Sequence, residues 1–264
     1  MKSSIEQLSK SKCKYLKALR HKKYRRRENL FIAEGMNALE ASLRSSLYPL
    51  VEVVLNGRQA EILRGCPLAA RLPETIPVME ASDRDIASLS TEETPQGILA
   101  VCRMRFFDSS DLPIRPNGPL LYIDGVSDPG NLGTVIRTAA WFGLTEILLA
   151  PESVDPFNGK VLRASAGSFF TVKIIPIEQA ELKAFAAHKR LPMIATAPTG
   201  GNAPSSLRGN KPSILILGHE VAGVTADLLA SADSLVSIPG SGAVESLNLA
   251  AAASIILYEM TQSG

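Results

Sequence analysis

The feature that most constrains the fold is a series of short apolar runs in the C-terminal half of the chain. They lie at residues 120–123, 147–149, 172–175, 193–196, 214–217 and 235–238, and helix-like stretches separate them. The runs are continuous rather than alternating, which is typical of parallel strands covered on both faces. We therefore predict an α/β fold in which this half of the chain forms a parallel sheet between helices.

The N-terminal part of the chain predicts a smaller α/β domain. Residues 13–27 have the pattern of a basic helix, residues 30–33 and 51–55 read as strands, residues 34–44 read as a helix, and an apolar run covers 97–102. A stretch rich in proline and polar residues follows, as is common between domains. The predicted boundaries are a first domain at 1–104, a linker at 105–118 and a second domain at 119–264.

Composition narrows the class of protein. A chain of 264 residues with 45% hydrophobic and 20% charged residues can form packed cores. It has no signal-peptide pattern and no run near the roughly 20 apolar residues of a spanning helix, so we expect a soluble cytoplasmic protein without membrane contact. Cys13, Cys66 and Cys102 are too widely spaced for a CxxC site, and the chain has only three histidines, so we expect no metal centre.

Positive charge is concentrated at the N-terminus. Residues 1–27 contain 11 of the 28 Lys and Arg but only one of the 26 acidic residues. Such a density favours a phosphate-rich partner, which indicates RNA or DNA, although a solvated charged helix would have the same composition. The candidate RNA-binding residues are Lys14, Lys17, Arg20, Lys22, Lys23, Arg25, Arg26 and Arg27.

Three polar, glycine-rich loops follow predicted strands, where ligands of parallel sheets bind. The first loop, residues 124–133, leads into a helix predicted at 134–142. Its glycines allow close approach of the backbone to a ligand, although a structural turn would explain them equally well. Asn131 and Arg137 flank the helix start, where both side chains could face the loop.

The second and third loops leave structural alternatives open. The second loop, residues 218–223, contains Glu220, which could instead cap a helix beginning near Thr225. The third loop, residues 238–249, leads into an alanine-rich helix, with Ser246 as a candidate N-cap and Asn248 as a first-turn residue.

Taken together and in this order, the loops resemble the motifs of the SpoU (TrmH-like) family of RNA 2′-O-ribose methyltransferases, within the SPOUT superfamily. The three motifs are NLGTVIRTA at 131–139, LGHEVAG at 217–223 and IPGSGAVESLNL at 238–249. The segment RASAG at 163–167 is also similar to the family. The basic helix, FIAEG at 31–35 and PQG at 95–97 resemble the ribosomal-protein-like substrate-binding domain of the family.

The resemblance implies properties that the residue pattern does not. It implies a deep trefoil knot in the second domain, S-adenosylmethionine as the cofactor and a homodimer. It also implies RNA as the substrate, with ribosomal RNA favoured over transfer RNA and guanosine a common target. The cofactor-binding residues implied are Gly218, Ile238 and Leu247, with Thr196 and Ala197 as further candidates. The catalytic residues implied are Arg137, Asn131, Glu220, Ser246 and Asn248.

The family's essential arginine matches Arg137. A guanidinium stays protonated at ordinary pH, so we expect Arg137 to hold a phosphate and stabilise charge on the 2′-oxygen rather than act as a base. The second motif departs from the family at His219 and at Val221. Relatives often have Asn or Ala in place of His219 and Gly in place of Val221. This departure affects the backbone of the loop and therefore the geometry with which it would bind the cofactor.

Two other classes of function fit parts of the sequence. A non-catalytic RNA-binding protein would explain the basic N-terminus but not three polar loops at strand ends. A Rossmann nucleotide enzyme would explain the sheet, but the first loop has no GxGxxG pattern and the chain has no GK[ST] phosphate loop. Both therefore rank below an RNA methyltransferase.

Overall fold

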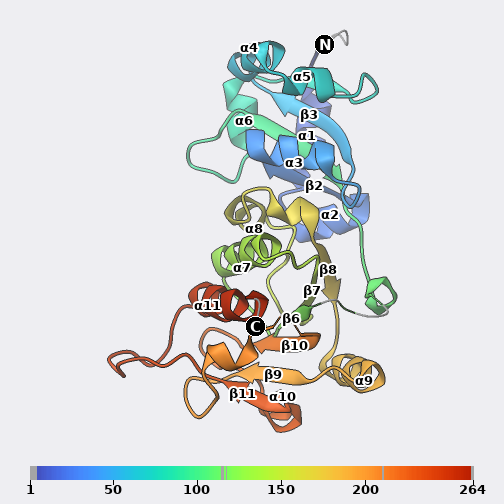
Figure 1. Ribbon diagram of the computed structural model, residues 1–264. Coiled ribbons are helices and arrows are strands. Elements are labelled where there is room, and N and C mark those ends of the chain that lie inside the picture. Colours follow the sequence, from blue (N-terminus) through green and yellow to red (C-terminus); the bar gives the residue numbers. More distant parts are fainter. Residues whose placement is uncertain (1–4, 114–115, 117, 210, 263–264) are drawn as a thin grey trace. The chain divides into compact units, whose positions relative to one another are not determined.

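The computed structural model describes residues 5–113, 116, 118–209 and 211–262 and divides into two compact units (Figure 1). Unit 1 comprises Met1–Arg105 and Phe157–Thr171, and unit 2 comprises Phe106–Pro156 and Val172–Gly264. Residues 114, 115 and 117 of the predicted linker, and 210, 263 and 264 of the predicted second domain, lie outside the described residues. The predicted boundaries did not anticipate that residues 157–171 group with the N-terminal unit.

Unit 1 is a mixed sheet with helices around it. Its strands have the order β1-β4-β3-β5-β2, in which β1, β4 and β3 are parallel and β5 is antiparallel to β3 and β2. The elements are β1 (Glu6–Gln7), α1 (Lys10–Ala18), α2 (Lys22–Glu28), β2 (Leu30–Glu34), α3 (Met36–Arg44), β3 (Leu50–Leu55), α4 (Gly57–Gly65), α5 (Leu68–Arg71), β4 (Val78–Glu80), α6 (Asp83–Leu89), β5 (Ile98–Arg103), α8 (Gly159–Ala164) and η2 (Ser168–Thr171). The strands predicted at 30–33 and 51–55 and the apolar run at 97–102 are confirmed.

The predicted single helix at 13–27 is wrong, because the segment forms two helices with a turn between them. Main-chain N–H groups of Leu19, Arg20 and His21 donate to carbonyls three residues earlier, which ends α1. The guanidinium of Arg25 then donates to the Leu19 and Arg20 carbonyl oxygens at 2.9 and 2.8 Å. A buried side chain of α2 therefore satisfies the carbonyls at the end of α1 and fixes the turn.

The two N-terminal motifs of the resemblance meet at the end of β2. Gly35 has φ +102°, and a Cβ on it would lie 2.6 Å from the side chain of Gln96. The Glu34 carboxylate accepts hydrogen bonds from Ser90 Oγ at 2.5 Å and from the Gln96 N–H at 2.9 Å. These motif residues therefore hold the loop before β5 against β2.

An aromatic cluster explains why residues 157–171 belong to unit 1. Phe157 and Phe169 from this segment pack against Phe31 of β2 and against Tyr48, with ring centroids 5.1 Å apart for Phe31 and Phe157 and 4.8 Å for Tyr48 and Phe169. Each of the four side chains is buried. Large aromatic rings contribute much of the burial energy of a small core, so the segment is part of the core of unit 1.

Unit 2 is a six-stranded sheet of order β11-β9-β10-β6-β7-β8, in which all neighbours are parallel. All six predicted strands are confirmed, with bounds shifted by no more than two residues. The elements are η1 (Ser109–Asp111), β6 (Pro119–Ile123), α7 (Pro129–Trp141), β7 (Glu146–Leu149), β8 (Lys173–Pro176), α9 (Gln179–Lys189), β9 (Met193–Thr196), η3 (Pro204–Leu207), β10 (Ser213–Leu217), α10 (Ala226–Ser231), β11 (Ser234–Val236) and α11 (Leu249–Thr261).

The helix after the first loop begins earlier than predicted. It starts at Pro129 rather than at residue 134, because Asp128 is its N-cap and accepts the Asn131 N–H at 2.8 Å. Proline suits the first helical position, since its missing N–H would have no partner there. The helices α7 and α11 pack side by side (Figure 1), and Thr138 and Ser254 hydrogen-bond between them at 3.2 Å.

Within the described part of the chain, no helix is both long enough and apolar enough to cross a bilayer. No cluster of three or more metal-ligating side chains occurs among the same residues.

Candidate active site

The loops singled out in the sequence gather at one edge of the sheet of unit 2. β6 and β10 are neighbours and run parallel, so the loops that follow Ile123 and Leu217 leave the sheet together. β9 lies between β10 and β11, so the loops after these strands leave at the same edge. The carboxyl edge is where parallel sheets bind ligands, and it is the candidate site.

Glu220 joins the second loop to the first through four hydrogen bonds. Its carboxylate accepts from the Ser127 N–H at 3.2 Å, from Ser127 Oγ at 3.3 Å, from the Asp128 N–H at 3.2 Å and from Asn131 Nδ2 at 3.0 Å. Partial burial by itself would raise the pKa of Glu220, but hydrogen bonds from Asn131 and from main-chain N–H groups outweigh it and lower the pKa. Glu220 is therefore held as a carboxylate and does not cap α10.

Asn131 connects the same network to the third loop. Its Oδ1 accepts from Asn248 Nδ2 at 2.8 Å, while its Nδ2 is the donor to Glu220. Asn248 also caps α11, because its Oδ1 accepts the N–H groups of Ala250 and Ala251 at 2.9 and 3.3 Å. The prediction of Ser246 as the N-cap is therefore wrong, because the helix begins two residues later than that cap requires.

A second carboxylate, on the first loop, accepts a hydrogen bond from the second loop. Asp124, buried at the end of β6, accepts the Thr225 N–H from the end of the second loop at 2.8 Å. Its other oxygen accepts from Gln179 Nε2 at 3.0 Å, and Gln179 also donates to Thr225 Oγ1 at 3.1 Å. The first loop thus anchors the second through Asp124, and the second anchors the first through Glu220.

The second loop is a tight turn in which Gly218 is required by close packing. The main chains of His219 and Gly223 exchange two hydrogen bonds of 2.9 Å. A Cβ on Gly218 would lie 2.2 Å from the Gly223 carbonyl carbon, and Gly223 has φ +71°. Val221 has no positive φ and is 91% exposed, so this backbone accepts valine at the position where the resemblance led us to expect glycine. His219 Nδ1 accepts the Val221 N–H at 3.1 Å, which occupies that ring nitrogen within the turn.

Arg137 lies two turns along α7 from Asn131 and is exposed. It makes no hydrogen bond or ion pair with the described residues, in contrast to the fixed polar side chains at the loop edge. Neither a fold-supporting ion pair nor a packing role explains an arginine here. The free guanidinium is available for a ligand from solvent.

Of the remaining cofactor candidates, Thr196 and Ala197 lie at the end of β9, whereas Ile238 and Leu247 lie in the segment between β11 and α11. Thr196 Oγ1 donates to the Ile216 carbonyl at 3.1 Å, and the Ala197 N–H donates to the Val236 carbonyl at 3.0 Å. Ile238 is half-buried, and Leu247 is 47% exposed. Ser246 is exposed and makes no hydrogen bond with the described residues, so it does not join the Asn131–Glu220–Asn248 network.

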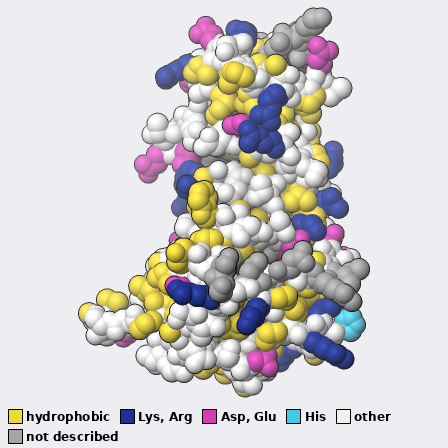
Figure 2. All heavy atoms as spheres, viewed as in Figure 1, with side chains coloured by type: hydrophobic (Ala, Val, Ile, Leu, Met, Phe, Trp, Pro, Cys, Tyr) yellow, Lys and Arg dark blue, Asp and Glu magenta, His cyan; other side chains and the backbone are white. Residues whose placement is uncertain are grey.

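The segment between β11 and α11 stands away from the rest of unit 2 (Figure 1). In Figure 2 it forms the projecting lobe at the lower left, where hydrophobic side chains are exposed. Val244, within this segment, is 72% exposed. The third motif therefore presents apolar surface that a ligand or a partner chain can cover.

The basic candidates of unit 1 fall into two groups. Arg25 is buried and bonded to main-chain carbonyls, so its role is structural. The others are exposed, namely Lys14, Lys17, Arg20, Lys22, Lys23, Arg26 and Arg27. Arg27 also pairs with Glu28 at 2.6 Å and stacks over Tyr24. The opposite faces of α1 and of the turn bury Leu16 and Leu19 in the core, so this basic surface is carried by a folded element.

Sequence reasoning missed four residues that hold the site together, namely Asp124, Ser127, Asp128 and Gln179. Asp128 carried a readable signal, because Asp followed by Pro is a common start of a helix. Asp124 bonds to Thr225 and Gln179, which lie 101 and 55 positions further along the chain, and no local pattern indicates such pairs.

A parallel α/β sheet with a polar network across its carboxyl-edge loops, in a chain that also carries exposed basic helices, is the arrangement expected of an enzyme that acts on nucleic acid. Comparison with known families identifies which enzymes these are. The chain belongs to the SpoU rRNA methylase family, whose model matches residues 119–258, and the model of the MRM3-like substrate binding domain matches residues 10–100.

Individual relatives match almost the whole chain. It is 34% identical to the 23S rRNA (guanosine(2553)-2′-O)-methyltransferase RlmP of Bacillus subtilis, over 97% of this chain and 98% of the relative. It is 29% identical to the 23S rRNA (guanosine-2′-O-)-methyltransferase RlmB of Pectobacterium atrosepticum, over 86% of this chain and 96% of the relative. A crystal structure of an AdoMet-bound rRNA methyltransferase from Sinorhizobium meliloti is 28% identical, covers 97% of this chain and 96% of its own, and has a TM-score of 0.80.

Proposed function

We propose that this protein methylates the 2′-hydroxyl of a ribose in ribosomal RNA, with S-adenosylmethionine as the methyl donor. The observation that carries the proposal is the Asn131–Glu220–Asn248 network, which joins three family motifs and includes the helix that carries the exposed Arg137. Relatives that match across both units are named as 23S rRNA methyltransferases, which favours ribosomal over transfer RNA. Both of the relatives reported above are named for guanosine, and we extend that target to this protein.

The residues at the sheet edge fit an uncharged, main-chain mode of cofactor binding. Gly218 leaves no side chain between the turn and the sheet, and the half-exposed Ile238 and Leu247 offer apolar surface for an adenine ring. Thr196 and Ala197 would complete this side of the pocket. When bound, S-adenosylmethionine supplies an electrophilic methyl group on a positively charged sulfur.

The chain's own residues then divide into holding and acting groups. Both polar ends of the Asn131 amide and all of the hydrogen bonds of Glu220 are used between loops, so these side chains position the loops. Arg137 has no partner among the described residues, and its planar guanidinium can hold a phosphate and the 2′-oxygen together. Positioning of the two reactants and stabilisation of developing oxygen charge are the contributions that this geometry offers.

The substrate is attracted by the basic surface of unit 1. Exposed side chains such as Lys14, Lys22 and Lys23 carry no acidic partner among the described residues, which leaves their charge for RNA phosphates. Ribosomal RNA as the substrate is consistent with the cytoplasmic location predicted from the sequence, which is part of this proposal.

A homodimer is also part of the proposal. Trp141, Ile255 and Tyr258 lie on the neighbouring helices α7 and α11 and are 84%, 40% and 51% exposed. Large apolar side chains grouped in this way commonly mark a protein contact. Light scattering should give the mass of a dimer, and Trp141→Glu should shift it to that of a monomer. The trefoil knot implied by the resemblance stays a prediction.

Two measurements test the reaction. Calorimetry should detect binding of S-adenosylmethionine or its demethylated product, and a nicotinamide cofactor should not bind. Mapping of 2′-O-methyl sites in ribosomal RNA from a strain without this gene should reveal one lost site that the purified protein restores. Binding of the nicotinamide cofactor alone, or an unchanged methylation map, would refute the proposal.

A further inference from the structure

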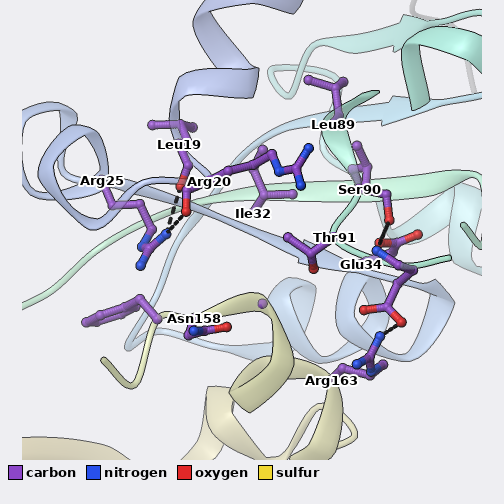
Figure 3. Close-up of a pocket in the computed structure, with 14 residues that line it drawn as sticks. Leu19, Arg20, Arg25, Ile32, Glu34, Leu89, Ser90, Thr91, Asn158 and Arg163 are labelled. Carbon is purple, nitrogen blue, oxygen red and sulfur yellow. Dashed lines mark hydrogen bonds and ion pairs between the residues drawn. The ribbon is translucent and has the colours of Figure 1, made fainter. Parts of the chain in front are cut away.

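Unit 1 contains a cavity that the methyl-transfer chemistry does not use. Its volume is about 60 Å³, and Figure 3 shows the side chains around it. The walls come from the turn after α1, from strand β2, from the loop after α6 and from the first turn of α8. A space of this size holds roughly four to six water molecules, which suits one planar ring but excludes a double helix.

The cavity walls are fixed before any ligand arrives. Arg25 holds the turn at Leu19 and Arg20 through its two main-chain hydrogen bonds. On the opposite side, a Cβ on Gly159 would lie 2.7 Å from Thr91 Oγ1, so the start of α8 fits closely against the loop. An ion pair between Arg163 and Glu92 joins the same two segments (Figure 3). Preformed pockets of this kind are typical ligand sites, because binding then orders little of the protein.

The lining combines an apolar floor with a few polar groups. Its apolar side chains are Leu19, Ile32, Leu89, Leu99 and Phe157. The negative charge of Glu34 is engaged by hydrogen bonds from Ser90 and Gln96. The lining therefore places no uncompensated carboxylate where an anionic ligand would enter.

Two polar side chains retain donors for a ligand. Arg20 is exposed, and its guanidinium makes one hydrogen bond with the described residues, from Nη1 to the Ser88 carbonyl at 3.2 Å. Asn158 caps α8 through Oδ1, which accepts the Lys160 N–H at 2.9 Å, and its Nδ2 has no partner among the described residues. The cavity therefore offers the Arg20 guanidinium, which can bind a phosphate, and the Asn158 amide, which can donate a hydrogen bond to the edge of a base.

We propose that this cavity binds a single unpaired nucleotide of the RNA substrate. Its base lies on the apolar floor, the Asn158 amide donates to a base oxygen or nitrogen, and Arg20 binds the adjoining phosphate. Single-stranded RNA is commonly recognised through unstacked bases inserted between protein side chains. The turn between the basic helices α1 and α2 forms one wall of the cavity, so RNA attracted by the charge of these helices would be held next to it. The inference rests on the proposed function only in taking RNA as the ligand.

The test fills the cavity from an exposed position. Thr91→Trp places an indole in the space, and Thr94→Trp is the matched control, since Thr94 is exposed in the same loop but does not line the cavity. Each variant is titrated with an RNA hairpin carrying an unpaired loop and with a blunt RNA duplex of equal length. We expect Thr91→Trp to weaken hairpin binding about tenfold and duplex binding less than twofold, because a bound base contributes about that much affinity. The control should match wild type.

A second variant decides the matter if Thr91→Trp melts at a lower temperature than wild type. Asn158→Asp keeps an oxygen to cap α8 but replaces the amide donor with a negative charge, and it should give the same selective loss for the hairpin. Equal losses for hairpin and duplex, or no loss for either variant, would overturn the inference. Methyl transfer by wild type to native ribosomal RNA is measured in parallel, because its absence would contradict the proposed function while leaving the hairpin comparison valid.

Discussion

Replacing Glu220 with glutamine should loosen the loops of the site by an amount that the structure predicts. Glu220 accepts two hydrogen bonds at each of its two carboxylate oxygens. A glutamine has one oxygen, which can accept two of these hydrogen bonds, and one NH2 group, which cannot accept the other two. At about 1 kcal/mol for each missing bond, the free energy of unfolding of unit 2 should fall by about 2 kcal/mol. The corresponding decrease in melting temperature is roughly 4 to 8 °C.

The pH dependence of this difference gives a sharper test than its size. Because its hydrogen bonds lower the pKa of Glu220 in the folded protein, the carboxylate stabilises the fold above its unfolded pKa of about 4.3. That stabilisation is lost as pH falls through the lower folded pKa. Glutamine does not titrate, so the difference in melting temperature between wild type and variant should be largest near pH 7 and smaller at pH 4.

Thermal unfolding followed by circular dichroism at both pH values measures the effect. Glu181→Gln is the matched control, because Glu181 is exposed on α9 and makes no hydrogen bond with the described residues. S-adenosylmethionine affinity should fall with Glu220→Gln and stay constant with the control. A variant that melts within about 1 °C of wild type, or a difference that does not shrink at low pH, would refute the role given to Glu220.

Three further predictions follow from the site and the basic surface. Arg137→Ala should reduce single-turnover methyl transfer at least about a hundredfold without changing the melting temperature or the cofactor affinity. Arg137→Lys should be almost as impaired, because an ammonium lacks the planar set of donors. Wild-type turnover by the alanine variant would refute the catalytic role of Arg137. Changing Lys22 and Lys23 together to serine should lower RNA affinity. The slope of log affinity against log salt concentration should become less steep by about one unit for each phosphate that is no longer bound. An unchanged slope would show that these side chains do not bind phosphate. Gly218→Ala should abolish cofactor binding in calorimetry, because its Cβ would lie 2.2 Å from the main chain of the same turn. Gly65→Ala is the control and should bind the cofactor normally, because a Cβ there has no neighbour within 4 Å. Normal binding by both variants would contradict the role given to the tight turn.

The sheet of unit 2 could be predicted because its signal is local. Continuous apolar runs specify buried strands, and each such run became a strand with nearly the predicted bounds. The loops that follow the strands then had to meet at one edge, so the closeness of Asn131, Glu220 and Asn248 was accessible from their positions alone. The start of α7 was missed although Asp128 and Pro129 carried its signal.

Other features depend on long-range interactions that no local pattern contains. The turn between α1 and α2 is fixed by Arg25, whose side chain would be expected to face solvent from composition alone. Asp124 reads as one polar residue in a polar loop, and its function depends on Thr225 and Gln179, which the fold brings to it. The assignment of Ser246 to the site came from resemblance, and Ser246 is exposed and has no hydrogen bond with the part of the chain that the structure describes.

Because residues 157–171 belong to unit 1, the chain cannot be cut between β5 and β6 into two fragments with complete cores. An expressed fragment that ended with β5 would expose Phe31 and Tyr48, since Phe157 and Phe169 would be missing from around them. A fragment beginning at β6 would carry the same two phenylalanines without their partners. Each half would thus expose an aromatic surface and is expected to aggregate, so we expect the two units to fold stably only when both are expressed in one chain.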